Sequence, residues 1–516
     1  MTAEPTHQAR PDASALLIFA LFAVFFLAFV LRTAGMAAES PWNGEALSLR
    51  HLDAATYTEF TARDLGNDEN ARQVPVYFIL QYTWSKWVGH SVYRMRMLSV
   101  LFSMLSLGLL FAVARRLYDA LTALVASLLF TVSLPHIYFA QEIGFYSLIT
   151  LLALLSVYLF LRAVQGESFA WWILLILADA LLIWTHVFGS LLWLAQGLFL
   201  FGFRRKWRGR AAFWLVSHGL LCGLFGSWLY STEYFIQDPY TSVATPTGRE
   251  FLNACHVYAG GRYSELNPSA YLPSGQSFDR IITVWLGLMV ATLAIRATAS
   301  WQRHAPNESP RDRARGIESF AFSLAWYIVP PLFLFLVSQV WKPFFAYPHA
   351  LFASLGLYIM AGKTLASLAS RRAQAAVLLV LGFMFAHQLT VLSGPFRPDY
   401  YAASDYIAAH GSDKDPIFVL NELNGVPFTY NATVDRGRIE THEGLDELYD
   451  AVLARIDERK DAWVVLWQWD DTDAVEEYFV EQGVSLRRVT FPGIPPLYLY
   501  RLRHAFPLAK PLLARM

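Results

Sequence analysis

The sequence predicts an α-helical membrane protein with about 11 transmembrane helices and a small extracytoplasmic α/β domain at its C-terminus. Three observations support this fold class. Apolar stretches near the length that crosses a bilayer recur through residues 1–394, and basic residues gather in alternate loops between them. Residues 395–516 have the composition of a soluble domain.

The apolar stretches are expected to form membrane spans because each approaches the roughly 20 residues that cross about 30 Å of hydrocarbon. The first stretch lacks a small-residue cleavage site, so we interpret it as a retained signal anchor, with a cleaved leader as the alternative. The third and fifth stretches are the shortest. In chain order the expected spans are 14–31, 95–114, 120–134, 145–161, 170–185, 187–203, 211–230, 281–299, 320–340, 344–362 and 373–392.

The charges between the spans predict the orientation. Counted from a cytoplasmic N-terminus, each loop on the cytoplasmic side carries arginine or lysine, as the positive-inside rule requires. We therefore expect a multi-pass protein of a bacterial inner membrane, with its C-terminal domain in the periplasm. The basic loops contain Arg115 and Arg116, then Arg162, then residues 204–210, then residues 303–315, and finally Lys363 with residues 371–372.

The composition argues against several functional classes. The chain has 516 residues, of which 55% are hydrophobic and 16% aromatic, and its formal net charge is zero. These values suit a polytopic membrane protein and point to no nucleic-acid partner. Cys222 falls within an expected span and Cys255 in an outer loop, so we expect neither a disulfide between them nor a thiolate metal cluster. No second histidine stands at metal-ligand spacing from His186, and we predict no metal and no cofactor.

Two long loops are expected outside the membrane together with the C-terminal domain. Loop 32–94 contains an aromatic run at 74–88 with the amphipathic pattern of a helix in the membrane interface, and loop 231–279 is rich in Gly, Pro, Ser and Tyr. Long loops of this kind are usually functional or disordered. The C-terminal domain is predicted to contain helices at 399–410, 445–456 and 473–482 and strands at 417–420, 463–467, 486–490 and 497–501.

Two acidic residues are candidate catalytic bases. Glu45 follows the first span, in the segment Trp42-Asn43-Gly44-Glu45-Ala46. A carboxylate just outside a span is partly desolvated, which raises its pKa and suits it to accept a proton. Glu142 lies in a tight outer hairpin at 135–146, where ionisable groups near hydrocarbon are costly. The alternatives are a solvated loop glutamate for Glu45 and a helix cap for Glu142.

Basic and polar residues near the outer surface are candidate substrate ligands. A lipid-linked substrate has its phosphate there, and guanidinium or ammonium groups bind phosphate through charge-assisted hydrogen bonds. For each cation the alternative is an ordinary interfacial anchor. The cationic candidates are Lys86, Arg94, Arg96, Arg249, Arg262 and Lys342, and the other polar candidates are His136, Gln141, Tyr146, His186 and His349.

Together these segments resemble the GT-C superfamily of polytopic glycosyltransferases, in particular bacterial relatives of the protein O-mannosyltransferases and of the lipid A aminoarabinose transferase. The matching segments follow the family order through nearly the whole chain. They are residues 42–46, 75–77, 89–102, 114–118, 135–146, 185–189, 342–345 and 397–400.

The resemblance implies a polyprenyl-phosphate sugar as the donor and no nucleotide site. An acceptor hydroxyl or amine, on a glycan, lipid or protein, would attack the anomeric carbon while the lipid phosphate leaves, with inversion. Glu45 is the base carried over from the family, with Glu142 second. Arg96, Lys86 and Lys342 are the candidates for stabilising the leaving phosphate.

Four positions differ from the family pattern, and they leave a second hypothesis open. Gly44 stands in place of an Asp, Gly144 in place of an Arg, residues 73–75 in place of a His-Pro-Pro-like segment, and Tyr347-Pro348 in place of an Arg-Tyr pair. The second hypothesis is a non-catalytic relative that binds a lipid-linked saccharide or supports an envelope glycan assembly complex. A transporter or flippase is less favoured, because the sequence shows no inverted repeat.

Overall fold

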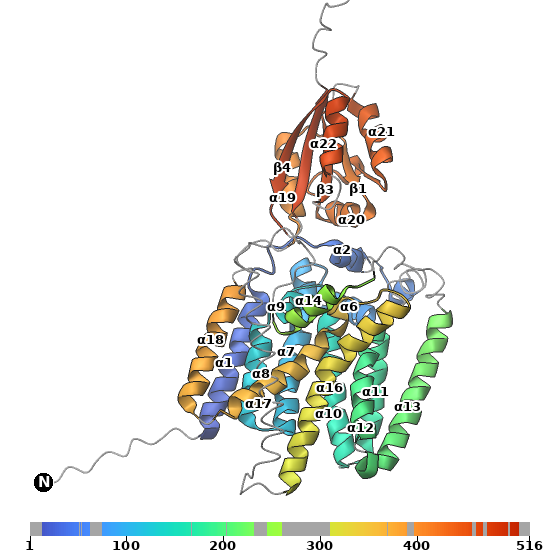
Figure 1. Cartoon of the computed structure of the whole chain (residues 1–516). Helices are drawn as coiled ribbons and strands as arrows, with labels where there is room; N and C mark the ends of the chain where they lie inside the picture. The colour runs from blue at the N-terminus through green and yellow to red at the C-terminus, as the bar shows by residue number, and fades with distance from the viewer. Residues whose placement is uncertain are drawn as a thin grey trace, which may run out of the picture.

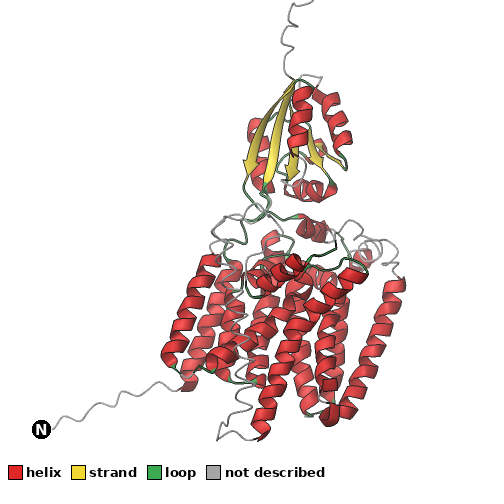
Figure 2. Cartoon of the chain, viewed as in Figure 1, coloured by secondary structure: helices red, strands yellow, loops and turns green. Residues whose placement is uncertain are grey.

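The structure is a computed structural model. It describes residues 13–50, 52, 54–61, 75–166, 168–202, 204–231, 245–260, 310–368, 370–389, 397–456, 461–467, 472–493 and 496–504. Long helices lie side by side in a bundle, and an α/β unit, defined here as residues 397–504, stands at one end of it (Figure 1). Figure 2 shows that the strands are confined to this unit.

Apolar helices form the bundle. Among the described residues, five helices are long and apolar enough to cross a membrane, and a sixth span results if the bent pair α8 and α9 is counted as one. The helices of the bundle are α1 (Ala13–Thr33), α7 (Val92–Leu117), α8 (Ala120–Val132), α9 (Leu134–Ala140), α10 (Tyr146–Gln165), α11 (Ala170–Thr185), α12 (Leu191–Gly202), α13 (Arg204–Ser231), α16 (Pro310–Val340), α17 (Ser354–Ala366) and α18 (Arg371–Leu389).

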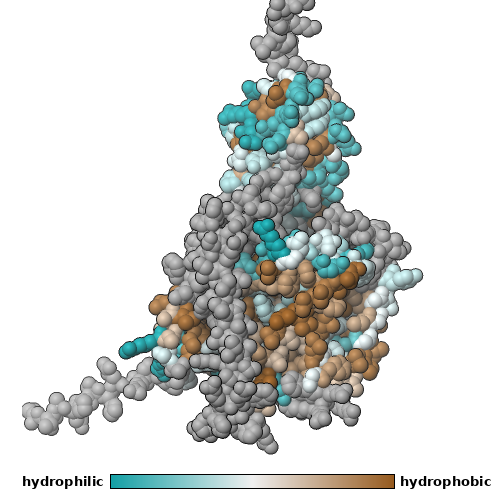
Figure 3. Space-filling view, in the orientation of Figure 1, coloured by the Kyte–Doolittle hydropathy of each residue, from teal (hydrophilic) through white to brown (hydrophobic). Residues whose placement is uncertain are grey.

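The bundle has an apolar interior and an apolar exterior. One large cluster of buried side chains joins α7, α8, α10, α12 and α17, and α8 packs against α17 while α10 packs against α7 and α11. Large apolar side chains such as Phe19, Leu220 and Leu336 are nevertheless exposed on the outside of the bundle. Figure 3 shows this brown surface over the helices and a mostly teal surface over the α/β unit. A helix bundle with this exterior is suited to lipid contact.

Short helices cover the end of the bundle that faces the α/β unit. They include α2 (Asn43–Arg50), α3 (Tyr57–Glu59), α6 (Pro75–Val88), α14 (Gly248–Tyr258) and the 3₁₀ helices η3 (Val187–Ser190) and η4 (Tyr347–Ala353). A capping box between Thr247 and Glu250 starts α14. The Tyr258 hydroxyl at its other end donates to the carbonyl oxygen of Tyr347 at 2.9 Å, which ties α14 to η4.

The α/β unit has a five-stranded sheet in the order β2-β1-β3-β5-β4. β1 (Ile417–Leu420) is parallel to β2 (Ile439–His442) and to β3 (Ala462–Trp467), whereas β5 (Leu497–His504) is antiparallel to β3 and to β4 (Val484–Phe491). Alternate residues of the central strands face opposite sides. One side packs on α21 (Leu445–Ile456) and α22 (Thr472–Glu481), and the other on α19 (Tyr400–His410) and α20 (Glu422–Asn431).

The observed elements confirm much of the prediction and correct part of it. The helix predicted at 74–88 is α6, and the helices and strands predicted within the α/β unit are all present. The segment 344–362, expected as one membrane span, is not one continuous helix. It starts with irregular backbone and η4 and becomes α-helical only at Ser354. The span expected at 281–299 lies outside the described residues. Length and composition identify five or six spans among the described residues, and the count of 11 stays a prediction.

Candidate active site

Glu45 is the centre of a buried polar cluster where the bundle meets the α/β unit. It lies in the first turn of α2 and is fully buried. The guanidinium group of Arg96, at the start of α7, donates from Nε to Glu45 Oε1 at 2.8 Å and from Nη2 to Glu45 Oε2 at 2.7 Å. The backbone N–H of Ile143 donates to Oε1 at 2.9 Å. This bidentate pair fixes α2 against the N-terminal end of α7.

The other donors of Arg96 bind backbone carbonyls of the loop before α2. Nη1 donates to the carbonyl oxygens of Met36 and Glu39 at 2.6 and 2.9 Å, and Nη2 donates to that of Ser40 at 3.4 Å. A guanidinium group has five N–H donors, and these contacts together with the two to Glu45 occupy all of them. Phosphate binding by Arg96 therefore stays a prediction, and it would require one of these bonds to be exchanged.

Arg397, from the start of the α/β unit, is the second cation of the cluster. Its Nη1 lies 3.4 Å from Glu45 Oε2, and its Nη2 donates to the Gln141 carbonyl oxygen at 3.1 Å. The side chain is almost completely buried and its guanidinium carbon lies 5.3 Å from the centre of the Tyr138 ring. Sequence reasoning gave Arg397 no role, although it noted the segment 397–400. An arginine directly before a proline, just after the last span, was the available signal.

The two arginines decide the ionisation of Glu45. Burial alone would raise the pKa of its carboxyl group, but the charges of Arg397 and Arg96 outweigh this effect, so the pKa of Glu45 is lowered. The same attraction raises the pKa of Arg397 despite burial of that side chain. Glu45 is therefore a carboxylate at neutral pH, and most of its acceptor positions are occupied.

Glu142 is the other buried carboxyl group of the cluster, and its environment is different. It lies between α9 and α10, beside Ile143, which binds Glu45, and it is only 4% exposed. Its Oε2 atom makes no hydrogen bond of normal geometry to the residues that the structure describes, although the Trp42 side chain lies close enough to oppose the rise in the pKa of this group. Burial raises the pKa of Glu142 to about 8; the charge of Arg397 opposes this rise and the charge of Glu45 adds to it. This carboxyl group can therefore gain or lose a proton near neutral pH.

Two further residues shape the surroundings of Glu142. At Gly144, an added Cβ atom would lie 3.2 Å from Glu142 Oε1, so a side chain at this position would crowd the carboxyl group. Tyr77 of α6 is fully buried, and its pKa is raised by burial and by the charges of Glu142 and Glu45. Tyr77 was part of a recognised motif but was not predicted as a site residue.

Several predicted ligands take structural roles close to this cluster. Gln141 donates from Nε2 to the carbonyl oxygens of Leu31 and Ala34, both at 3.0 Å, and so holds the C-terminal end of α1. His136 is buried, with Nε2 2.8 Å from the hydroxyl of Ser354. Tyr146 begins α10 and packs its ring on Phe139.

The predicted histidines His186 and His349 form a second group. Their rings lie 5.3 Å apart at η3 and η4, and Phe145 connects them to the first cluster by contacting both His186 and Tyr77. The backbone N–H of Phe188 donates to His186 Nδ1, so the Nε2 atom of His186 carries the proton of the neutral ring. His349 Nδ1 bonds the Phe344 carbonyl oxygen, which can only accept, so its Nε2 is an acceptor in the neutral ring. The pair thus presents one donor and one acceptor.

The remaining described cations among the predicted ligands lie on α6, α7 and α14 and between α16 and η4. Lys86 donates to the Ala54 carbonyl oxygen at 3.0 Å and lies over the Tyr82 ring. Arg94 is exposed and donates to the Val88 carbonyl oxygen at 2.7 Å. Lys342 is half-buried between α16 and η4, and Arg249 is an exposed residue of α14. Arg262 lies outside the described residues. Within the described ranges, no group of three His, Cys, Asp or Glu side chains could hold a metal ion.

Comparison with known proteins supports the family resemblance. Residues 72–228 match the family model described as dolichyl-phosphate-mannose-protein mannosyltransferase. The resemblance to GT-C glycosyltransferases is confirmed. The matched segment contains Arg96, Gln141 and Glu142, whereas Glu45 and Arg397 lie outside it. Comparison with curated proteins gave no match.

The solved structures that are similar to this chain have low sequence identity to it. The Archaeoglobus fulgidus oligosaccharyltransferase AglB, in complex with an inhibitory peptide and a dolichol-phosphate, is 10% identical, with a TM-score of 0.50 over 88% of this chain and 70% of that chain. ArnT from Cupriavidus metallidurans, bound to undecaprenyl phosphate, is 12% identical, with a TM-score of 0.45 over 95% of this chain and 98% of that chain. At such identity the AglB likeness concerns the fold alone.

Proposed function

We propose that this protein is an inverting glycosyltransferase that moves a sugar from a polyprenyl-phosphate carrier to an acceptor hydroxyl or amine. The match to a mannosyltransferase family and the fold shared with AglB, whose structure contains dolichol-phosphate, support the reaction class and the donor class. The reaction would take place on the outer face of a bacterial inner membrane, with the N-terminus in the cytoplasm. In this proposal residues 1–394 form the membrane domain and residues 395–516 a periplasmic domain.

The observation that carries the proposal is the buried carboxyl group of Glu142. It combines a pKa near 8, an oxygen atom that makes no hydrogen bond of normal geometry to the described residues, and a neighbouring glycine, Gly144, at which a side chain would crowd the carboxyl group. A general base works best when its pKa is close to the operating pH and one of its oxygen atoms is available. Glu142 meets these requirements better than Glu45, the base that the family resemblance suggests.

Each residue of the cluster then has a distinct task. Glu142 takes the proton from the acceptor O–H or N–H as the acceptor atom bonds to the anomeric carbon. The bond between that carbon and the phosphate oxygen breaks, and the lipid phosphate leaves with the electron pair. Glu45, held by Arg96 and Arg397, positions the Ile143 backbone next to Glu142 and keeps two buried positive charges near the reaction. Lys86, Lys342 and the His186–His349 pair remain proposed ligands of the donor.

Sugar transfer in reconstituted vesicles tests the assignment of Glu142. With polyprenyl-phosphate sugars as donors, Glu142→Gln should lower the transfer rate by about 100-fold or more, because the amide cannot accept the proton. Glu443→Gln is the matched control, since Glu443 is an exposed carboxylate of the α/β unit. Full activity of Glu142→Gln would remove Glu142 from the base role. Translocation of lipid without a glycosylated product would identify a flippase.

A second candidate function is binding of a lipid-linked saccharide without turnover. The observation that favours it is the complete engagement of Arg96 and the double pairing of Glu45, which leave the family's expected base and an expected phosphate ligand occupied. Mass spectrometry of lipids that co-purify with the wild-type protein separates the two functions. A retained prenyl-phosphate saccharide, together with no transfer to any acceptor, would establish the binding function.

A further inference from the structure

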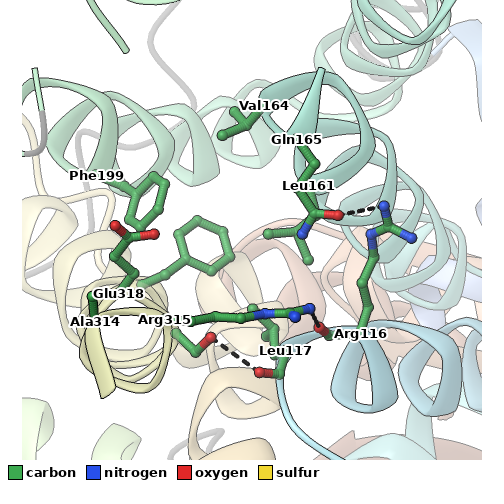
Figure 4. A pocket seen from close by; sticks show the side chains of 11 residues that line it. Arg116, Leu117, Leu161, Val164, Gln165, Phe199, Ala314, Arg315 and Glu318 are labelled. Carbon is green, nitrogen blue, oxygen red and sulfur yellow. Dashed lines mark hydrogen bonds between the residues drawn. The ribbon is translucent and has the colours of Figure 1, made fainter. Parts of the chain in front are cut away.

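A cavity of about 470 Å³ opens at the end of the bundle opposite the α/β unit. It forms where α7 and α10 end and α16 begins, with α12 alongside. None of the residues in the proposed active site contributes to it. Its walls consist of Arg116, Leu117, Leu161, Val164, Gln165, Phe199, Ala314, Arg315, Glu318, Ser319 and Phe322 (Figure 4).

One side of the cavity is cationic and held in place by hydrogen bonds. The guanidinium group of Arg116 donates from Nη2 to the side-chain oxygen of Gln165, which joins α7 to α10. Arg315 of α16 donates from Nη2 to the Arg116 carbonyl oxygen at 3.2 Å. Ser319 donates to the Leu117 carbonyl oxygen at 3.0 Å and fixes α16 against the end of α7. Two guanidinium groups from different helices therefore border the same space.

The opposite side of the cavity carries a negative charge. In Figure 4 the Glu318 carboxylate lies beside Phe199, well separated from the Arg116 guanidinium group across the cavity. Glu318 and Arg315 belong to the same helix, yet their charged ends point in different directions in this view. The cavity thus has a positive and a negative end, which is the arrangement that a ligand with both a phosphate and an amine would require.

The inner wall of the cavity is apolar and close to lipid. The Phe199 and Phe322 rings lie 5.4 Å apart, and Leu161 and Val164 of α10 complete this wall. Leu198 and Ile317, which directly precede the lining residues Phe199 and Glu318, are exposed on the outside of the bundle. The cavity is therefore next to the exposed apolar surface of the bundle, where the acyl chains of a lipid could lie while its headgroup occupies the cavity.

We propose that this cavity binds the headgroup of an aminophospholipid from the membrane leaflet on this side of the bundle. The phosphate lies between Arg116 and Arg315, the primary amine pairs with Glu318, and the glycerol and upper acyl chains pack against Phe199 and Phe322. Basic pockets between membrane helices commonly bind phospholipid headgroups. Glu318 is what distinguishes this site, because a lipid without an amine would place no positive group of its headgroup opposite that carboxylate.

Native mass spectrometry of the full-length protein, with phosphatidylethanolamine, phosphatidylglycerol or phosphatidylcholine added at equal concentration, tests the proposal. Phosphatidylethanolamine should bind best. Arg315→Gln should weaken its binding by about fivefold, and Arg315→Lys should restore most of it. Glu318→Gln should abolish the preference for phosphatidylethanolamine over phosphatidylglycerol. Arg371→Gln, at an exposed arginine that starts α18, is the matched control and should bind like the wild type.

Three results would overturn the proposal. Equal binding of the three lipids by the wild type would show that the cavity does not discriminate between lipid headgroups. Unchanged binding in correctly folded Arg315→Gln would place the lipid elsewhere. Displacement of the lipid by soluble phosphoethanolamine at comparable concentration would show a site for a free phosphate ester and not for a membrane lipid. The lipid-binding experiment does not measure sugar transfer. The result of this experiment is therefore independent of the proposed function.

Discussion

Replacing Glu142 by glutamine should change how the stability of the protein depends on pH. The pKa of Glu142 is raised from 4.5 to about 8 in the folded state, so the folded protein binds more protons than the unfolded chain between these values. The free energy of unfolding therefore falls as the pH rises from 4.5 to 8. Each pKa unit corresponds to about 1.4 kcal/mol, so the loss attributable to this one group approaches about 5 kcal/mol as an upper bound.

Glutamine has nearly the same shape and cannot ionise, so Glu142→Gln should remove this loss. The variant and the wild type should unfold at similar temperatures near pH 5, and the variant should be the more stable of the two at pH 9. Thermal unfolding followed by intrinsic fluorescence is a suitable assay, because the chain has 17 tryptophans. Glu443→Gln, at an exposed position, serves as the control and should follow the wild type throughout. Parallel curves for Glu142→Gln and the wild type would refute the reasoning.

The remaining predictions concern the same cluster. Glu45→Gln leaves two buried guanidinium groups without their carboxylate and should cost about 3–5 kcal/mol of stability, measured as a lower unfolding midpoint; an unchanged midpoint would contradict the pairing. Arg397→Gln removes a charged contact between the α/β unit and the bundle and should cost about 1.5–3 kcal/mol. Limited proteolysis between the two parts should then be faster, and equal cleavage rates would count against this contact. Gly144→Arg places a cation beside Glu142 Oε1 and should move the pH transition of stability below 8; an unmoved transition would show that the new side chain points away.

The sequence was sufficient for elements whose physical cause is local. A long apolar run predicts α1, α7 and α10, because an unsatisfied backbone in hydrocarbon is too costly for anything but a helix. A short continuous apolar run likewise identifies β3, and an apolar pattern with a period of 3.6 residues identifies α21. The same criteria miss α20, which contains Gly425 and Pro427, and β2, whose four residues carry charge and no clear alternation. Neither element has a local signal, and both are stabilised by packing within the α/β unit.

The site was predictable only in part, for a related reason. Glu45 and Glu142 stand in recognisable segments, but the sequence does not reveal which carboxyl group is paired and which has a raised pKa. That difference depends on Arg397, whose contact with the Gln141 carbonyl spans 256 positions in the chain. It also depends on Arg96, which binds four different residues at once. No periodicity or short motif encodes contacts of this length.

Charge balance gives these long-range contacts a functional consequence under the proposed function. Among the buried side chains of the cluster, Arg96 and Arg397 are positive, Glu45 is negative, and Glu142 is neutral below a pH of about 8. The cluster then has a net positive charge, which favours an anionic phosphate donor nearby. Loss of the proton from Glu142 cancels this charge but creates the base that the acceptor requires. Donor binding and base ionisation therefore oppose each other, and a pKa of Glu142 close to the working pH lets both forms be populated during one cycle. The contribution of Arg397 makes this balance depend on the docked α/β unit, which explains physically why a residue so distant in sequence belongs to the site.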